Sequence, residues 1–126
     1  MSEAKKKILV VDDEPDIVNM LKMRLEASGY EVIIAGDGNT AYNKAKSDSP
    51  DLIILDLMLP NMDGYQVCGL LKKDTRYAKI PIIIFTARAQ KSDQDLGLEV
   101  GANAYITKPF EAKELLEKIK SLLGGQ

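Results

Sequence analysis

Short runs of hydrophobic residues alternate along this chain with longer segments in which hydrophobic and polar positions are mixed. Most of the short runs are continuous and rich in β-branched residues, which is typical of strands that are covered on both faces. Strands that alternate with helices in this way predict an α/β fold built around a parallel sheet. The predicted strands are residues 8–11, 32–34, 52–55, 82–85 and 104–106.

The longer segments have the spacing of amphipathic helices. In the first of them, Ile17, Leu21 and Leu25 recur at every fourth position, so that one face is hydrophobic. Asp63 stands directly before the third and is its expected N-cap. The predicted helices are residues 14–28, 39–47, 64–73, a fourth that begins near Ser92, and 111–123.

The fourth predicted helix is the weakest of the five. Ser92 and Asp95 resemble a capping box at its start, but its hydrophobic residues are few and Gly97 lies inside it. A glycine inside a helix costs about 1 kcal/mol relative to alanine. We therefore expect this helix to be the most mobile and the easiest to shift.

The composition narrows the possible chemistry. The chain has 126 residues, 45% hydrophobic and 29% charged, which fits a single domain that spans residues 1–126. It contains no histidine and one cysteine, Cys68. A lone cysteine can form neither an internal disulfide nor, without histidine, a four-ligand zinc site. Catalysis by histidine is also excluded, and Cys68 is expected to be a small core residue.

The charge argues against several classes of partner. Seventeen basic and nineteen acidic residues give a formal charge of −2, and residues 5–7 form the one dense basic run. The four hydrophobic residues after that run are too few for a membrane span or the core of a signal peptide. We therefore expect no direct nucleic-acid contact, no membrane insertion and a cytoplasmic location.

Polar residues follow four of the predicted strands at the points where those strands end. Asp12 and Asp13 follow the first strand, and Asp56 follows the third. Thr86 comes directly after the fourth strand, and Lys108 lies shortly after the fifth. Open α/β sheets bind ligands at the carboxyl ends of their strands. We therefore expect these five side chains to converge at one edge of the sheet.

This combination of groups favours phosphoryl chemistry. Three carboxylates at one edge would raise each other's pKa values unless a cation lay among them. Hard oxygen ligands without histidine or thiolate suit Mg²⁺ or Mn²⁺. Lys108 and the hydroxyl of Thr86 could then bind the oxygens of a phosphoryl group. One carboxylate remains as spectator or nucleophile, and Asp56 is the best candidate to attack phosphorus and become an aspartyl phosphate.

Six segments in a fixed order match the pattern of one known family. They are ILVVDDEP at residues 8–15, DLIILDLMLP at 51–60, MDG at 62–64, FTA at 85–87, GANAY at 101–105 and KPF at 108–110. With these motifs the chain resembles the CheY-like receiver domain of two-component response regulators, and the resemblance spans nearly its whole length. It implies a doubly wound, flavodoxin-like fold: a five-stranded parallel sheet in the order 2-1-3-4-5 with five helices.

The resemblance also implies a set of site residues. Asp56 would be the phosphoacceptor. Asp12 and Asp13 would hold Mg²⁺ directly or through water, with Asp56 and the backbone carbonyl of Met58 as further ligands. Lys108 would form an ion pair with the phosphoryl group.

Further residues would make up the switch. Thr86 resembles the hydroxyl residue that turns toward the phosphoryl group, and Tyr105 corresponds to the aromatic residue whose rotamer follows it. An ordinary half-buried aromatic residue at this place in the last strand would be compatible with that role. Lys108 and Pro109 match the family's cis peptide bond, which would direct the lysine into the site.

The function implied is a phosphorylation switch rather than an enzyme with a separate substrate. A sensor histidine kinase or a phosphotransfer protein would donate a phosphoryl group to Asp56. Arg88 and Met58 would flank the acyl phosphate and tune its lifetime. The surface of the fourth helix, fifth strand and fifth helix would then repack and engage a protein target or an output domain. A phosphorylation-dependent dimer through this surface is compatible with that mechanism.

Other functions fit the residues less well. An FMN carrier would share the fold, but the acidic residues 12–14 would repel its phosphate. A phosphatase of the haloacid dehalogenase type would need a second aspartate where Met58 stands. An unphosphorylated scaffold would normally have lost an acidic residue or the lysine, and none is lost here. The completed last helix without a charged linker favours a stand-alone regulator over a receiver within a longer protein.

Overall fold

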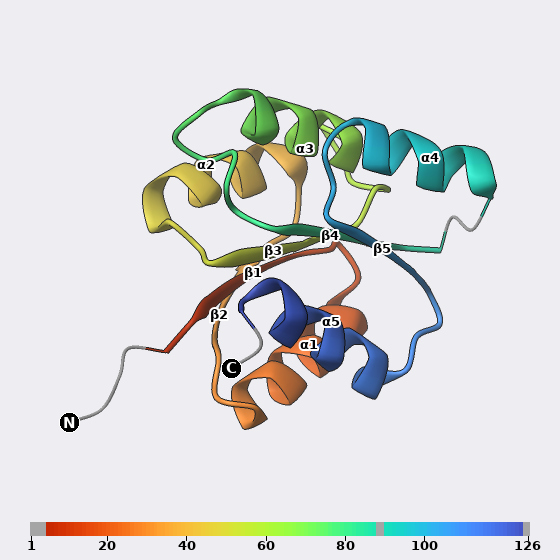
Figure 1. Ribbon diagram of the computed structural model, residues 1–126. Helices are drawn as coiled ribbons and strands as arrows, with labels where there is room; N and C mark the ends of the chain where they lie inside the picture. Colours follow the sequence, from red (N-terminus) through yellow and green to blue (C-terminus); the bar gives the residue numbers. More distant parts are fainter. Residues whose placement is uncertain (1–4, 88–89, 125–126) are drawn as a thin grey trace.

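The structure is a computed structural model and describes residues 5–87 and 90–124. Strands and helices alternate along the chain, and the strands form one parallel sheet in the order β2-β1-β3-β4-β5, which confirms the predicted fold class (Figure 1). Among the described residues, no helix combines the length and the apolar character that crossing a membrane requires. The elements are β1 Lys7–Val11, α1 Pro15–Ala27, β2 Glu31–Ala35, α2 Gly38–Asp48, β3 Leu52–Leu55, α3 Gly64–Lys73, β4 Ile82–Thr86, α4 Lys91–Glu99, β5 Ala104–Thr107 and α5 Ala112–Leu122.

Helices cover both faces of the sheet. Successive side chains of a strand point to opposite faces, so Leu9 and Val11 of β1 pack with α2 and α3, whereas Ile8 and Val10 pack with α1 and α5. Figure 1 shows α4 on the same side as α2 and α3. The continuous hydrophobic runs of the sequence thus fill two cores, one on each side of the sheet.

The register of the sheet brings the ends of four strands to one edge. Val11 of β1 lies beside Leu55 of β3, and Leu55 lies beside Ile84 of β4. Thr86 of β4 lies beside Thr107 of β5. The polar residues that follow these strands are therefore delivered to neighbouring positions.

Two predicted helix starts have different outcomes. Asp63 is the N-cap of α3, as predicted, and forms a capping box with Gln66. The predicted cap at Ser92 is wrong, because α4 begins at Lys91 and its N-cap is Gln90, which makes no side-chain capping bond. The extended backbone at Gln90 (φ −70°, ψ 147°) starts the helix early enough that Ser92 already lies in the first turn.

Gly97 has a packing role that the sequence did not indicate. It is the buried residue of α4. A Cβ atom at this position would lie 2.9 Å from Cδ1 of Ile84 and 3.0 Å from Cδ2 of Tyr105. The missing side chain therefore lets α4 lie close against β4 and β5.

Candidate functional site

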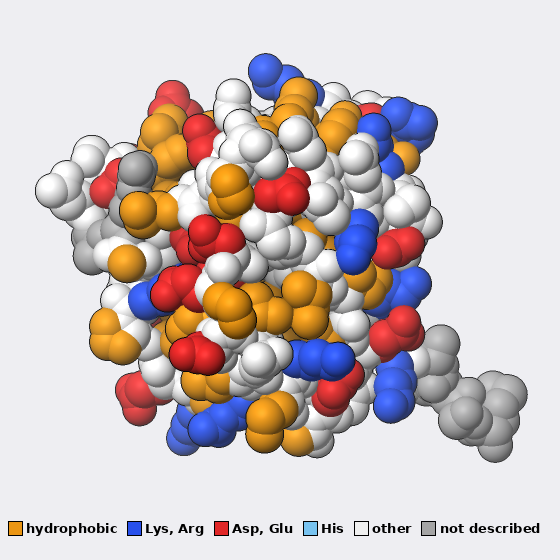
Figure 2. Space-filling view, turned by 180° about the vertical axis from the view of Figure 1, so that it is seen from behind, with side chains coloured by type: hydrophobic (Ala, Val, Ile, Leu, Met, Phe, Trp, Pro, Cys, Tyr) orange, Lys and Arg blue, Asp and Glu red, His pale blue; other side chains and the backbone are white. Residues whose placement is uncertain are grey.

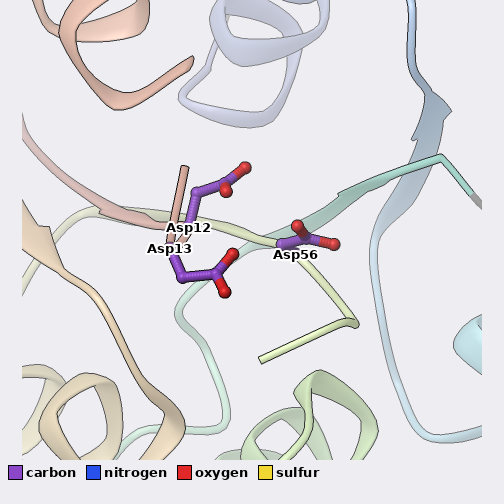
Figure 3. A group of neighbouring side chains, drawn as sticks. All are labelled: Asp12, Asp13 and Asp56. Carbon is purple, nitrogen blue, oxygen red and sulfur yellow. The ribbon is translucent and has the colours of Figure 1, made fainter. Parts of the chain in front are cut away.

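Three carboxylates meet at the carboxyl edge of the sheet (Figure 3). Asp12 and Asp13 follow β1, and Asp56 follows β3. One carboxylate oxygen from each residue lies within 4.8 Å of those from the other two. Asp12 and Asp56 are buried, whereas Asp13 is exposed. The cluster therefore opens to solvent on the side of Asp13.

The two buried carboxylates are held in the same way. Oδ1 of Asp12 accepts a hydrogen bond from the N–H of Glu14 at 2.9 Å. Oδ1 of Asp56 accepts one from the N–H of Met58 at 3.1 Å. Each residue thus has its Oδ1 occupied by the main chain, and in both cases Oδ2 accepts from Lys108.

Lys108 enters the site from the end of β5. Its N–H donates to the carbonyl of Thr86 at 2.8 Å, and the peptide bond that joins it to Pro109 is cis. Its Nζ donates to Oδ2 of Asp12 at 2.7 Å and to Oδ2 of Asp56 at 3.2 Å. The side chain is 12% exposed, so the ammonium group lies largely sheltered between the two carboxylates.

Aromatic residues support the same ammonium group. Nζ of Lys108 lies 5.1 Å from the centroid of the Phe85 ring, a separation at which a cation is attracted to the ring face. The Phe85 ring meets that of Phe110 edge to face, with 4.7 Å between centroids. Sequence reasoning did not assign either phenylalanine to the site, because each is an apolar residue that also fits the core.

The electrostatics leave the site with excess negative charge. Burial raises the pKa of Asp12, because desolvation of the carboxylate outweighs its hydrogen bonds with Lys108 and with the N–H of Glu14. Burial alone would lower the pKa of Lys108, but the hydrogen bond to Asp12 and the charges of Asp56 and Asp12 outweigh it and raise that pKa. Lys108 is therefore protonated at neutral pH and balances only part of the acidic charge.

The donor set fits a divalent cation. The cluster supplies three hard carboxylate oxygens and no nitrogen or sulfur donor, the ligand type that Mg²⁺ and Mn²⁺ prefer. The cluster also sets three carboxylates against the one ammonium group of Lys108, so a cation would balance the remaining negative charge. The role of the Met58 carbonyl as a further ligand stays a prediction.

The two predicted switch residues lie on neighbouring strands. Thr86 is fully buried at the end of β4, and Tyr105 is half-buried on β5. Tyr105 is paired with Ile84 across the two strands and lies against Gly97 of α4. Movement of these two side chains on phosphorylation stays a prediction, and Arg88 lies outside the described residues.

Glu14 belongs to the site although the sequence analysis gave it no role there. Its Oε1 accepts a hydrogen bond from Nζ of Lys108 at 3.2 Å. Glu14 is the N-cap of α1, but its side chain makes no capping bond. Glutamate is not among the residues favoured at an N-cap. The sequence carried no direct signal of this contact, because the contact depends on where the Lys108 side chain lies in the folded protein.

Cys68 is not part of the site. Its side chain is fully buried, which agrees with the expectation of a core residue, and its Sγ lies 3.8 Å from the carbonyl oxygen of Val100. Burial raises the pKa of the thiol to about 11. The group is therefore a neutral thiol at physiological pH.

Curated proteins of similar sequence are regulators of transcription by name. The alkaline phosphatase synthesis transcriptional regulatory protein PhoP of Bacillus subtilis is 49% identical over 118 residues. The DNA-binding dual master transcriptional regulator RpaA of Synechocystis is 44% identical over 117 residues. These matches cover 94% and 93% of this chain but 48% of each relative. The chain thus spans about half the length of the curated relatives it matches.

Solved structures and a family model match nearly the whole chain to response regulators and their receiver domains. A putative response regulator from Chloroflexus aurantiacus is 36% identical with a TM-score of 0.91, and the match covers 95% of this chain and 98% of that one. The receiver domain of a Pseudomonas aeruginosa sensor histidine kinase, with a magnesium ion coordinated in its active-site cleft, is 32% identical with a TM-score of 0.89, and the match covers 96% and 99%. The model of the response regulator receiver domain matches residues 8–120, and the chain therefore belongs to this family.

Proposed function

We propose that this chain is a phosphorylation-activated signalling switch in which Asp56 accepts the phosphoryl group. The observation that carries the proposal is that Oδ2 of Asp56 and Oδ2 of Asp12 share the ammonium group of Lys108, with the carboxylate of Asp13 beside them. This arrangement offers a nucleophilic oxygen, a fixed positive charge for phosphoryl oxygens and ligands for a divalent cation. Membership of the receiver domain family supports the same role.

A divalent cation is part of the proposal. Asp12, Asp13 and Asp56 would hold Mg²⁺, with the carbonyl of Met58 as a further ligand, and Mn²⁺ has similar ligand preferences. When bound, the cation supplies positive charge to the phosphoryl oxygens. The magnesium ion in the cleft of the P. aeruginosa receiver domain supports this assignment.

The proposed reaction is a displacement at phosphorus. A carboxylate oxygen of Asp56 forms a new bond to phosphorus, while the bond between phosphorus and the leaving group of the donor breaks. The leaving group departs with the electron pair of that bond. The ammonium group of Lys108 would hold one oxygen of the transferred group, and the hydroxyl of Thr86 would donate to another. The site thus orients a reaction that changes the protein itself and needs no separate substrate.

The proposed output is a shift between two populations of the molecule. Thr86 would turn toward the new phosphoryl group, and Tyr105 would turn inward into the space that the threonine leaves. α4 and β5 would then repack. The close contact of Gly97 with Tyr105 supports this coupling, because a tyrosine ring that moves would change its packing against α4.

The partners follow from this role. A sensor histidine kinase or a phosphotransfer protein in the cytoplasm is the proposed donor, and a protein target or output domain would bind the surface of α4, β5 and α5. The same surface could support a phosphorylation-dependent dimer. The names of the B. subtilis and Synechocystis relatives support transcription as the process that is controlled. With a formal charge of −2, we propose that this chain itself contacts no nucleic acid and inserts into no membrane.

Intact-mass measurement after incubation with acetyl phosphate and Mg²⁺ tests the proposal. The wild type should gain one phosphoryl group, and peptide mapping should place it on Asp56. Asp56→Asn and a chelator should each abolish the adduct. Asp16→Asn removes an exposed carboxylate in the first turn of α1 and should label like the wild type.

Two outcomes would contradict the proposal. An adduct that persists in Asp56→Asn would place phosphorylation on another residue. A wild type that takes up no phosphoryl group and shows no change in unfolding temperature with Mg²⁺ would favour the unphosphorylated scaffold.

A further inference from the structure

Glu14 uses its side chain in an unexpected way for its place in the fold. It is the N-cap of α1, where Ser, Thr, Asp or Asn would accept a hydrogen bond from the first turn of the helix. Its carboxylate makes no such bond and instead reaches Lys108, 94 positions away in the sequence. The helix start is left without a side-chain cap, and within residues 5–87 and 90–124 the side chain of Glu14 bonds to Lys108 instead.

This contact completes the hydrogen bonding of Lys108. An ammonium group has three N–H donors. In the structure they meet three carboxylates, those of Asp12 at 2.7 Å, Asp56 at 3.2 Å and Glu14 at 3.2 Å. An additional phosphoryl oxygen would therefore have to displace one of these acceptors.

Glu14 is the acceptor that can leave at the least cost. Its side chain is 61% exposed, whereas those of Asp12 and Asp56 are 1% and 5% exposed. A carboxylate near the surface regains water when it loses its partner, but a buried one is left unpaired. Asp12 also holds the shorter contact and lies within the acidic cluster, to which Glu14 does not belong.

We propose that Glu14 is a positioning residue that restrains phosphorylation of Asp56 by holding Lys108. The inference rests on the proposed function of Asp56. In the unmodified site Glu14 occupies an N–H of the lysine that the phosphoryl group needs. When acetyl phosphate is the donor, an oxygen of Asp56 bonds to phosphorus and acetate leaves, and Lys108 must exchange the carboxylate of Glu14 for a phosphoryl oxygen.

Two substitutions separate this contact from a general effect of charge. Glu14→Gln keeps the length of the side chain and removes its charge. Glu14→Asp keeps the charge but shortens the side chain, and aspartate at an N-cap is drawn to the N–H groups of its own helix. Asp16→Asn is the matched control, because it removes an exposed charge two residues away that has no contact with Lys108 in the described structure.

The test is the initial rate of labelling by acetyl phosphate at saturating Mg²⁺, together with the urea midpoint of unfolding. Glu14→Gln and Glu14→Asp should both label about two- to five-fold faster than the wild type, the factor expected for an exposed ion pair. Asp16→Asn should label at the wild-type rate. Glu14→Asp should also raise the urea midpoint, so its faster labelling cannot come from a loosened fold.

Each contrary result has a distinct meaning. If the wild type labels and both Glu14 variants match Asp16→Asn, the inference is wrong while the proposed function stands. If Glu14→Gln is faster but Glu14→Asp is not, charge rather than contact with Lys108 is responsible, and the inference is again wrong. If the wild type takes up no label, the proposed function fails and the inference fails with it.

Discussion

At the scale of single residues, the two glycines of α3 differ in the space that is free for a side chain. Gly64 begins the helix, and a Cβ atom there would lie 2.5 Å from the carbonyl oxygen of Asp56 and 2.8 Å from Cα of Leu57. Both neighbours are backbone atoms, which cannot move aside without shifting the segment that carries Asp56. A Cβ atom at Gly69 would have nothing within 4 Å. Space rather than helix propensity thus decides which glycine is required.

We expect alanine at these two positions to change stability in opposite directions. Gly64→Ala should lower the free energy of unfolding by about 1–3 kcal/mol, the usual cost of overpacking. Gly69→Ala should raise it by about 0.5–1 kcal/mol, because alanine is the better helix former. Urea unfolding monitored by circular dichroism measures both values. A Gly64→Ala variant as stable as the wild type, or more stable, would show that the close approach at Gly64 does not control the segment.

The residues of the site differ in how far the sequence could reveal them. Asp12 and Asp56 could be found because each directly follows a hydrophobic strand, and the ends of parallel strands share one edge. Glu14 and Phe85 could not, because their roles depend on the path of the Lys108 side chain. That path is fixed by tertiary packing and leaves no periodic pattern in the sequence.

At the scale of elements, α4 is held at both ends by α3. The hydroxyl of Tyr65 donates to the carbonyl of Asp93 at 2.9 Å, near the start of α4. Sγ of Cys68 lies 3.8 Å from the carbonyl oxygen of Val100, the C-cap of α4. The sequence analysis predicted a weak helix because it considered only the residues of α4 itself, in which Gly97 lowers the helix propensity. Most helical stability comes from tertiary packing, which this glycine makes possible.

We expect Tyr65→Phe to loosen α4 selectively. Loss of the hydrogen bond to Asp93 removes a contact worth about 1 kcal/mol, so amide hydrogen exchange in α4 should become about five-fold faster, with little change in the strands. Hydrogen–deuterium exchange followed by mass spectrometry measures this. Tyr30→Phe is the matched control, because the Tyr30 hydroxyl makes no hydrogen bond among residues 5–87 and 90–124. Equal protection of α4 in both variants would argue against the role of Tyr65.

At the scale of the whole molecule, the charge is nearly balanced overall but not at the site. Acidic and basic side chains are interspersed with hydrophobic ones on the face shown in Figure 2. At the sheet edge, by contrast, the carboxylates of Asp12, Glu14 and Asp56 contact the ammonium group of Lys108, and that of Asp13 lies beside those of Asp12 and Asp56. The strand register imposes this arrangement, so folding itself brings like charges together. Repulsion among them should lower the stability of the unliganded protein.

We expect Mg²⁺ to stabilise the fold through this cluster. A ligand that binds only the folded state raises the free energy of unfolding by about 2.7 kcal/mol at a hundredfold excess over its Kd. Asp13→Asn should be more stable than the wild type in a chelator, because it relieves repulsion, but should gain less from Mg²⁺, because it loses a ligand. Urea unfolding with Mg²⁺ or chelator measures both effects, and Asp16→Asn should keep the full gain. An undiminished gain in Asp13→Asn would exclude Asp13 as a ligand.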